Sequence, residues 1–416
     1  MDYDRIVETV TQIGKEMYIR GAEVHRVEDT ITRMLKSFGA ESSDVFAITS
    51  QITVSAKFDN KTYTVMKRVG KTDADFTKIA QYNALSRETC EKHLSIEEVE
   101  AKHAEILASK PFPWYVSFLA YMLCCFSFAM FFGGDYLDGL SSAVLGILMF
   151  FANRYLKPHI NEFLYLFLVT FVTGCLGILF VFLGFGHNLD KVLIGTVMLV
   201  IPGMYITNAA RDLFLGETIS GLLKLIESLL SVVMISLGYV LAIYLFPYAS
   251  DSLVLSSNPW YLTLIVSLLG SLSFALLFKA NGKMILAALA GSCIASVFYV
   301  LFSVLFPLPT FLWSFLLALI AGIYSEIFAR IAKTPAISIL SIVLLPFYPG
   351  GSIYYTFAYL EEQKNDLFLS QFQVAGFTIL GIASGVILST VLIHYAVFLF
   401  QVLQKKKPKR ANKKNR

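Results

Sequence analysis

Two Pro-Gly pairs interrupt long apolar segments of this 416-residue chain, and short polar clusters follow both pairs. Pro202-Gly203 lies near the middle of one apolar segment, and Pro349-Gly350 lies near the middle of another. Proline removes a backbone donor and ends the helix before it, while glycine allows close approach to the backbone. A helix that restarts at Gly203 or Gly350 would point its positive end inward, which suits a carboxylate. The polar side chains that follow the two pairs are Tyr205, Thr207, Asn208, Ser352, Tyr354, Tyr355 and Thr356.

Hydroxyl and amide groups at these positions can hold an ammonium or hydroxyl group of a small ligand without burying a full charge. The alternative is hydrogen bonding between helices, which membrane bundles also use. Interrupted helices in corresponding positions are the best sequence indication of a transport site. We therefore favour a binding role for both Pro-Gly pairs and their polar clusters.

Three acidic residues lie within or at the end of apolar segments, where ionisable groups are costly and are functional candidates. Glu227 and Glu326 are candidates for a proton relay, and Asp212 is a third candidate for proton coupling. For Asp212, as for Arg211 and Arg330, an interfacial or orienting role is equally open.

One chemically dense stretch occupies residues 21–29 of the N-terminal region. His25 and Glu28 could act as an acid–base pair on one helix. We favour the alternative of a charged, solvated helix face, because no nucleophile or metal-ligand spacing accompanies the pair. The cysteines form no CxxC pair, and we expect neither a metal nor a cofactor. The motif positions are Gly21, Glu23, His25, Arg26 and Glu28.

Composition divides the chain into a soluble part and a membrane part. Charged residues make up 15% of the chain and hydrophobic residues 56%, whereas a typical soluble domain carries about 25% charge. The charge lies mainly before residue 110 and after residue 404, so we expect a soluble domain at 1–110 and a basic tail at 405–416. The tail more than supplies the net charge of +4, which argues against nucleic-acid binding.

The soluble part predicts a small α+β domain. Apolar residues recur at helical spacing before residue 21 and over residues 23–38, and two further helices are expected at 73–93 and 95–109. Between them, two segments with alternating residues meet at Asp59-Asn60, which predicts a hairpin. The acidic start of the chain does not resemble a signal peptide, so we expect this domain to remain in the cytoplasm.

Ten apolar segments are long enough to predict about ten membrane-spanning helices. If the N-terminal domain is cytoplasmic, most loop arginines and lysines fall on the cytoplasmic side, with only Lys191 and Lys364 opposite. Both termini are then cytoplasmic, and the expected location is the cell inner membrane. The cytoplasmic loop residues are Arg154, Lys157, Arg211, Lys279, Lys283, Arg330 and Lys333. The segments are 113–132, 139–153, 161–183, 191–210, 218–246, 259–278, 284–306, 311–329, 335–359 and 368–403.

The membrane part repeats itself. Residues 113–115 and 259–261 share the sequence Pro-Trp-Tyr, and a Ser-Phe-Ala motif at 127–129 recurs at 273–275, each 146 residues apart. These repeats divide the membrane part into two halves, 111–257 and 258–404, each with five spans. Because five is odd, the second half enters from the opposite side, an inverted 5+5 arrangement typical of secondary transporters that use alternating access.

The sequence resembles the threonine/serine exporter family in its fused single-chain form. The resemblance is carried by Gly21, Arg26 and Glu28 of the N-terminal motif and by the segments 201–203 (Ile-Pro-Gly) and 348–350 (Tyr-Pro-Gly). It implies export of threonine and serine driven by the proton-motive force. Related two-chain members are implicated in succinate export, and family members are suggested to have a hydrolase-like N-terminal domain.

Three functions therefore stay open. The leading one is proton-coupled export of threonine or serine, because the midplane segments contain no arginine or lysine and so suit a zwitterion better than a C4-dicarboxylate. The second is export of a C4-dicarboxylate such as succinate. The third is a membrane-tethered hydrolase or sensor acting through residues 1–110. The sequence contains no ATP-binding loop, and it leaves a homo-oligomer open.

Overall fold

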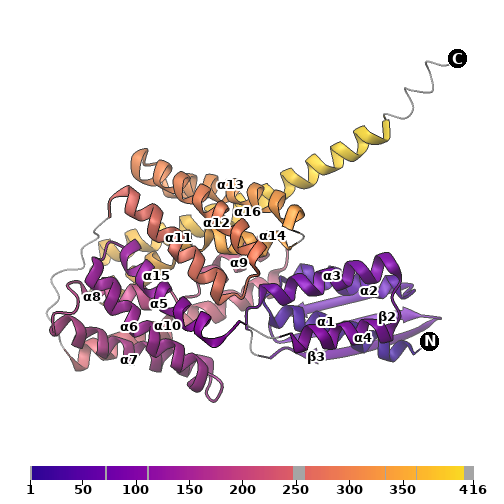
Figure 1. The fold of residues 1–416 in the computed structure, drawn as a ribbon, viewed down its shortest axis with the longest axis horizontal. Helices are drawn as coiled ribbons and strands as arrows, with labels where there is room; N and C mark the ends of the chain where they lie inside the picture. Colours follow the sequence, from indigo (N-terminus) through magenta and orange to yellow (C-terminus); the bar gives the residue numbers. More distant parts are fainter. Residues whose placement is uncertain are drawn as a thin grey trace.

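The computed structural model describes residues 2–70, 73–109, 112–246, 258–332, 334–361 and 363–406. A small N-terminal domain is followed by a larger helical bundle (Figure 1). Several features discussed above lie outside the described residues: the expected borders at 110–111 and at 257, Lys333, and residues 407–416 of the basic tail.

The N-terminal domain packs helices against a three-stranded antiparallel sheet of order β1-β2-β3. The predicted hairpin joins β2 to β3, and Asp59 and Asn60 adopt positive φ of 47° and 62°, as a type I′ turn requires. A turn at residues 49–50 splits the first predicted strand into β1 and β2, so the sheet has one strand more than the hairpin alone. The elements are α1 (Tyr3–Ile19), α2 (Val24–Ser37), β1 (Ser42–Ile48), β2 (Gln51–Phe58), β3 (Lys61–Arg68), α3 (Phe76–Lys92) and α4 (Ile96–Ala108).

The bundle consists of helices that follow the predicted apolar segments closely. Two of the segments are broken, as the Pro-Gly pairs predict: α8 ends before Pro202 and α9 begins at Gly203, while α14 and a short 3-10 turn end before Pro349 and α15 begins at Gly350. The first-half elements are α5 (Trp114–Phe131), α6 (Tyr136–Phe151), η1 (Ala152–Leu156), α7 (Glu162–Phe182), α8 (Leu189–Val197), α9 (Gly203–Phe214) and α10 (Thr218–Leu245). The second-half elements are α11 (Trp260–Leu277), α12 (Gly282–Tyr299), η2 (Val300–Leu305), α13 (Thr310–Ala332), α14 (Ala336–Leu344), η3 (Leu345–Phe347), α15 (Gly350–Glu361) and α16 (Asn365–Lys406).

The part of the chain that the structure describes holds 8 helices long and apolar enough to cross a membrane, and the bent pair α14–α15 makes up to 9. That pair is bent by 40° at its break. The chain is therefore a helical multi-pass membrane protein. The count of ten spans stays a prediction, because the α8–α9 segment is divided into two short helices.

Each helix of the first half has a counterpart in the second half. Pro113 and Pro259 precede α5 and α11 with nearly the same backbone angles, φ −53° and ψ 144° against φ −52° and ψ 142°. Both α6 and α12 end in a π-helical turn. Equivalent residues also touch: the rings of Phe128 and Phe274 pack edge-on with centroids 5.8 Å apart, where α5 crosses α11. Such a contact between equivalent residues is what we expect where a pseudo-two-fold axis relates the two halves of an inverted repeat.

The N-terminal domain lies against one end of the bundle, and the last helix, α16, extends past the bundle on that same side (Figure 1). Helices α8 and α15 lie at the other end of the bundle in this view. We call these two ends the N-domain side and the far side.

Candidate functional site

The two helix breaks have the same local geometry. After α8, the N–H of Gly203 donates to the carbonyl of Ile201 at 2.9 Å, across Pro202. After η3, the N–H of Gly350 donates to the carbonyl of Tyr348 at 2.8 Å, across Pro349. Each break is therefore a tight turn built around a proline, which cannot continue the hydrogen-bond ladder of the preceding helix.

The two breaks lie against each other, and we call this contact the break crossing (residues 201–203 and 348–350). A Cβ placed on Gly203 would lie 3.4 Å from the backbone nitrogen of Gly350. A Cβ on Gly350 would lie 2.9 Å from the sulfur of Met198, in the turn after α8. The first turns of α9 and α15 thus meet, which brings two positive helix ends together inside the bundle. An anionic group bound there would relieve their mutual repulsion.

The polar residues after the two breaks lie in different environments. The Thr207 hydroxyl donates to the carbonyl of Gly203 at 3.0 Å, and the Thr356 hydroxyl donates to that of Ser352 at 2.7 Å, so both bonds stay within their own helices. Asn208 is half-buried and has no hydrogen-bond partner among the described residues. The Ser352 hydroxyl is likewise half-buried without such a partner, so Asn208 and Ser352 are the side chains of this group most available to a ligand.

The aromatic residues of the predicted site face different neighbours. The Tyr354 ring packs edge-on against Tyr239 of α10, with centroids 6.4 Å apart. Tyr205 lies near the buried Tyr18 of α1. Burial raises the pKa of the Tyr18 phenol, and Tyr205, Glu227 and Asp212 raise it further. The first turns of α9 therefore approach the N-terminal domain.

A charged cluster on the far side joins the two halves of the bundle. The Lys191 ammonium lies 2.7 Å from Asp190 Oδ2 and donates to the Tyr355 hydroxyl at 2.8 Å. That hydroxyl donates to the same Asp190 oxygen at 3.3 Å. Lys191 is 1% exposed. We expected it in a loop on the side opposite the cytoplasm, and this loop assignment is wrong, because Lys191 lies in α8 and is buried. We call Asp190, Lys191 and Tyr355 the far cluster.

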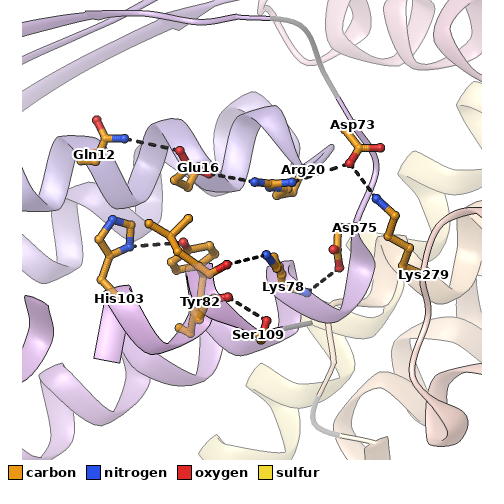
Figure 2. Close-up of polar contacts among 12 residues, drawn as sticks. Gln12, Glu16, Arg20, Asp73, Asp75, Lys78, Tyr82, His103, Ser109 and Lys279 are labelled. Atoms are coloured by element: carbon orange, nitrogen blue, oxygen red, sulfur yellow. Dashed lines mark hydrogen bonds and ion pairs between the residues drawn. The ribbon is translucent and has the colours of Figure 1, made fainter. Parts of the chain in front are cut away.

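The N-terminal domain is fastened to the bundle by ion pairs and a ring contact. Arg211, at the end of α9, pairs with the half-buried Glu23 of the N-terminal motif. Lys279 pairs with Asp73 at 2.6 Å, and Asp73 also lies 3.7 Å from Arg20 (Figure 2). The N–H of Phe76 donates to the carbonyl of Phe278 at 2.8 Å, and the two rings are 4.9 Å apart. The domain therefore contacts both α9 and the loop between α11 and α12.

Figure 2 also shows how this contact continues into the N-terminal domain. Gln12, Glu16 and Arg20 follow one another along α1 toward Asp73 and Lys279. At the start of the neighbouring α3, the Asp75 carboxylate caps the helix by accepting the N–H of Lys78. The Tyr82 hydroxyl, also on α3, lies 3.2 Å from Nδ1 of His103 of α4.

The N-terminal motif mainly serves this contact. Gly21 has φ of +97°, a left-handed conformation that ends α1 and lets the chain turn toward α2. Glu23 then reaches Arg211. Burial raises the pKa of Glu23, but Arg211, Arg26 and Lys224 lower it more, so the carboxylate stays ionised.

The remaining motif residues lie on the surface. His25 and Glu28 line a shallow cleft with Asp29, Thr32 and Ser43. Burial raises the pKa of Glu28, and its Oε1 accepts the N–H of Ala47 at 2.9 Å. In the described ranges, no group of three or more His, Cys, Asp or Glu side chains could hold a metal.

The three proton-coupling candidates do not meet at the break crossing. Asp212 pairs with Lys224 of α10 at 2.6 Å. Glu326 lies 3.9 Å from Arg330 of its own helix. Glu227 is exposed on α10. Their roles stay predictions.

The described geometry defines a multi-pass helical membrane protein with a small domain on one side. Comparison with protein families assigns it more closely. A family model for threonine/serine exporters matches residues 8–246, and a second model, Threonine/Serine exporter, ThrE, matches residues 263–392. The chain belongs to the threonine/serine exporter family.

One curated relative is described as a probable succinate transporter subunit, YjjP, of Klebsiella aerogenes. It is 22% identical over 228 residues, which cover 53% of this chain and 86% of the relative. No solved structure matches the chain.

The sequence reasoning missed Asp190, Lys191 and the partnership of Glu23 with Arg211. Lys191 stands at the edge of an apolar segment, where a loop assignment is the simpler choice. The repeat offers a signal: 147 residues later, Ser338 lies inside α14. Aligning the halves residue by residue would have moved Lys191 into the helix.

Proposed function

We propose that this protein exports threonine and serine by alternating access, with the substrate bound at the break crossing. The observation that carries the proposal is the contact between Gly203 and Gly350, which joins two interrupted helices from the two halves. Meeting helix N-termini favour the substrate carboxylate, and Asn208 offers an amide to its ammonium or hydroxyl group. The remaining predicted contacts come from Tyr205, Ser352 and Tyr354.

The proposal includes an inverted 5+5 topology in which α8–α9 and α14–α15 count as the fourth and ninth spans. The N-terminal domain, proposed at 1–110, would be cytoplasmic in the inner membrane. The shared placement of Arg211, Lys279 and the N-terminal domain on one side supports this orientation, because basic residues favour the cytoplasmic side.

Proton coupling is the least constrained part of the proposal. Asp212 is the strongest candidate, because it is largely buried and paired with Lys224 near the start of α10. Protonation of Asp212 would release Lys224 and loosen α9 from α10. Glu227 and Glu326 would act as accessory carriers.

Export of a C4-dicarboxylate is the second candidate. Two observations support it. Lys191 is buried in the bundle, so the argument that no cationic group lies near the substrate path no longer holds. The relative from Klebsiella aerogenes is described as a probable succinate transporter subunit. A hydrolase or sensor has less support, since Glu23 of its expected motif is engaged by Arg211 of the bundle.

Efflux from proteoliposomes tests the function. Purified protein is reconstituted into vesicles loaded with radiolabelled threonine, serine or succinate, with and without a pH gradient. We expect threonine and serine efflux that the gradient accelerates. Efflux of succinate alone would establish the second candidate, and no efflux of any of the three would favour the hydrolase or sensor.

A further inference from the structure

The far cluster is a closed triangle of charges and hydroxyl in an apolar part of the bundle. Asp190, Lys191 and Tyr355 contact one another at 2.7, 2.8 and 3.3 Å. The side chains of Lys191 and Asp190 are 2% and 11% exposed. Ile194 and Tyr359 pack on the Tyr355 side of the triangle. The two charges are thus removed from solvent and balance each other.

The fold itself does not require charges at this place. Lys191 and its counterpart Ser338 sit in equivalent turns: the N–H of Lys191 donates to the carbonyl of Asn188 at 3.1 Å, and that of Ser338 to the carbonyl of Pro335 at 3.2 Å. The second half builds the same turn with Ile337 and Ser338. Replacing a buried ion pair by apolar residues is often neutral or stabilising, so stability alone does not account for this pair. Ionisable groups inside a membrane bundle are candidates for binding a ligand.

The position of the cluster connects it to the break crossing. Tyr355 lies on α15, in the second turn after Gly350, while Asp190 and Lys191 begin α8 of the other half. The contact therefore spans the two halves on the far side. A separation of the halves on the far side would therefore take the Tyr355 hydroxyl away from both Asp190 and Lys191.

We propose that Asp190 and Lys191, with Tyr355, form a second substrate subsite on the far side that selects zwitterions. This inference rests on the proposed function. An α-amino acid carries an ammonium and a carboxylate on one carbon, and these match Asp190 and Lys191 respectively. Without substrate, the Asp190 carboxylate and the Lys191 ammonium pair with each other. A bound amino acid places its own ammonium at Asp190 and its own carboxylate at Lys191. A dicarboxylate can satisfy Lys191 but is repelled by Asp190.

The test measures equilibrium binding of radiolabelled threonine and succinate to the purified full-length protein. We expect Lys191→Met to weaken threonine binding at least about tenfold, the effect of losing one charged contact. Asp190→Asn should weaken threonine binding to a similar degree but leave succinate binding unchanged or stronger. Lys57→Met, which removes a solvent-exposed ion pair with Glu41 in the N-terminal sheet, is the matched control and should bind as the wild type.

Single variants leave one buried charge without its partner, so folding is checked by gel filtration. The double variant Asp190→Asn/Lys191→Met removes both charges and should fold; it should still bind threonine at least about tenfold more weakly. Wild-type threonine affinity in this double variant would overturn the subsite while leaving the proposed function intact. Binding of succinate alone by the wild type would overturn both the zwitterion subsite and the amino-acid substrate.

Discussion

Two glycines at the helix breaks differ in the space around them. Gly203 leaves room for one methyl group, since its added Cβ would make ordinary contacts of 3.4 to 3.6 Å with Gly350 and Tyr348. Gly351 leaves none, because an added Cβ would lie 2.3 Å from the ring of Phe132. Side-chain volume at these positions is therefore limited by the partner half.

Substitutions at Gly203 should show this limit in a graded way. Gly203→Ala should retain threonine efflux close to the wild-type rate, whereas Gly203→Leu should abolish efflux because its larger side chain forces the breaks apart. Efflux from proteoliposomes measures both, with membrane insertion checked by fractionation. Equal activity of the two variants would show that the contact is not required for transport.

Asn208 tests the ligand contact itself. Asn208→Ala removes a half-buried amide without a protein partner, so the fold should be little affected. We expect threonine efflux to fall about tenfold or more, the effect of about 1.4 kcal/mol of lost binding or transition-state stabilisation. Unchanged efflux would remove Asn208 from the site.

At the scale of elements, the breaks could be predicted but their partners could not. Pro202 and Pro349 ended their helices as proline chemistry requires. Lys191 acquires its role from Tyr355, 164 residues away, and Glu23 from Arg211, 188 residues away. Such contacts depend on how elements pack, and no periodicity within one element encodes them. The turn at residues 49–50 was missed because a Thr-Ser pair is a weak turn signal compared with Asp-Asn.

Docking of the N-terminal domain through α2 should depend on the Glu23–Arg211 pair. Glu23→Gln removes the hydrogen-bonded counter-charge of the half-buried Arg211 and should destabilise the docked arrangement by about 2 kcal/mol, the contribution of a hydrogen bond to a charged group. Hydrogen exchange of α2 and α9 measures this as faster exchange in both helices. Exchange at the wild-type rate would show that the other contacts suffice.

The same pair predicts a pH dependence. Because the pKa of Glu23 is lowered in the folded protein, its stabilising contribution is complete above its ordinary value and is lost as the pH falls through the lowered value. The protection of α2 against exchange, measured relative to the intrinsic amide exchange rate at each pH, should therefore fall on acidification below 4.5, the ordinary pKa of glutamate. The Glu23→Gln protein serves as the control and should lack this dependence on Glu23.

At the scale of the whole molecule, the two proposed halves meet where α5 crosses α11, at the contact between the Phe128 and Phe274 rings. The break crossing and the far cluster both combine residues from the two halves. Each half therefore contributes part of every proposed site, and neither half could transport alone.

Separate chains of residues 1–257 and 258–416, expressed together, should assemble and restore threonine efflux. The physical reason is the close packing between the halves at the α5–α11 crossing and at the break crossing, which does not depend on a covalent link. Copurification through a tag on one chain measures assembly, and Phe274→Arg should reduce it by placing a charge at the α5–α11 crossing. Failure of the unmodified halves to copurify would contradict this account.

The central claim is that the break crossing opens alternately to the two sides of the membrane. The most direct measurement is labelling of single cysteines at Asn208→Cys and Tyr354→Cys by a membrane-impermeant thiol reagent, in a transport-competent background whose five native cysteines are replaced. We predict that each position is labelled from both sides and that saturating threonine slows labelling of both. Labelling of each position from one fixed side only, unaffected by threonine, would contradict the account.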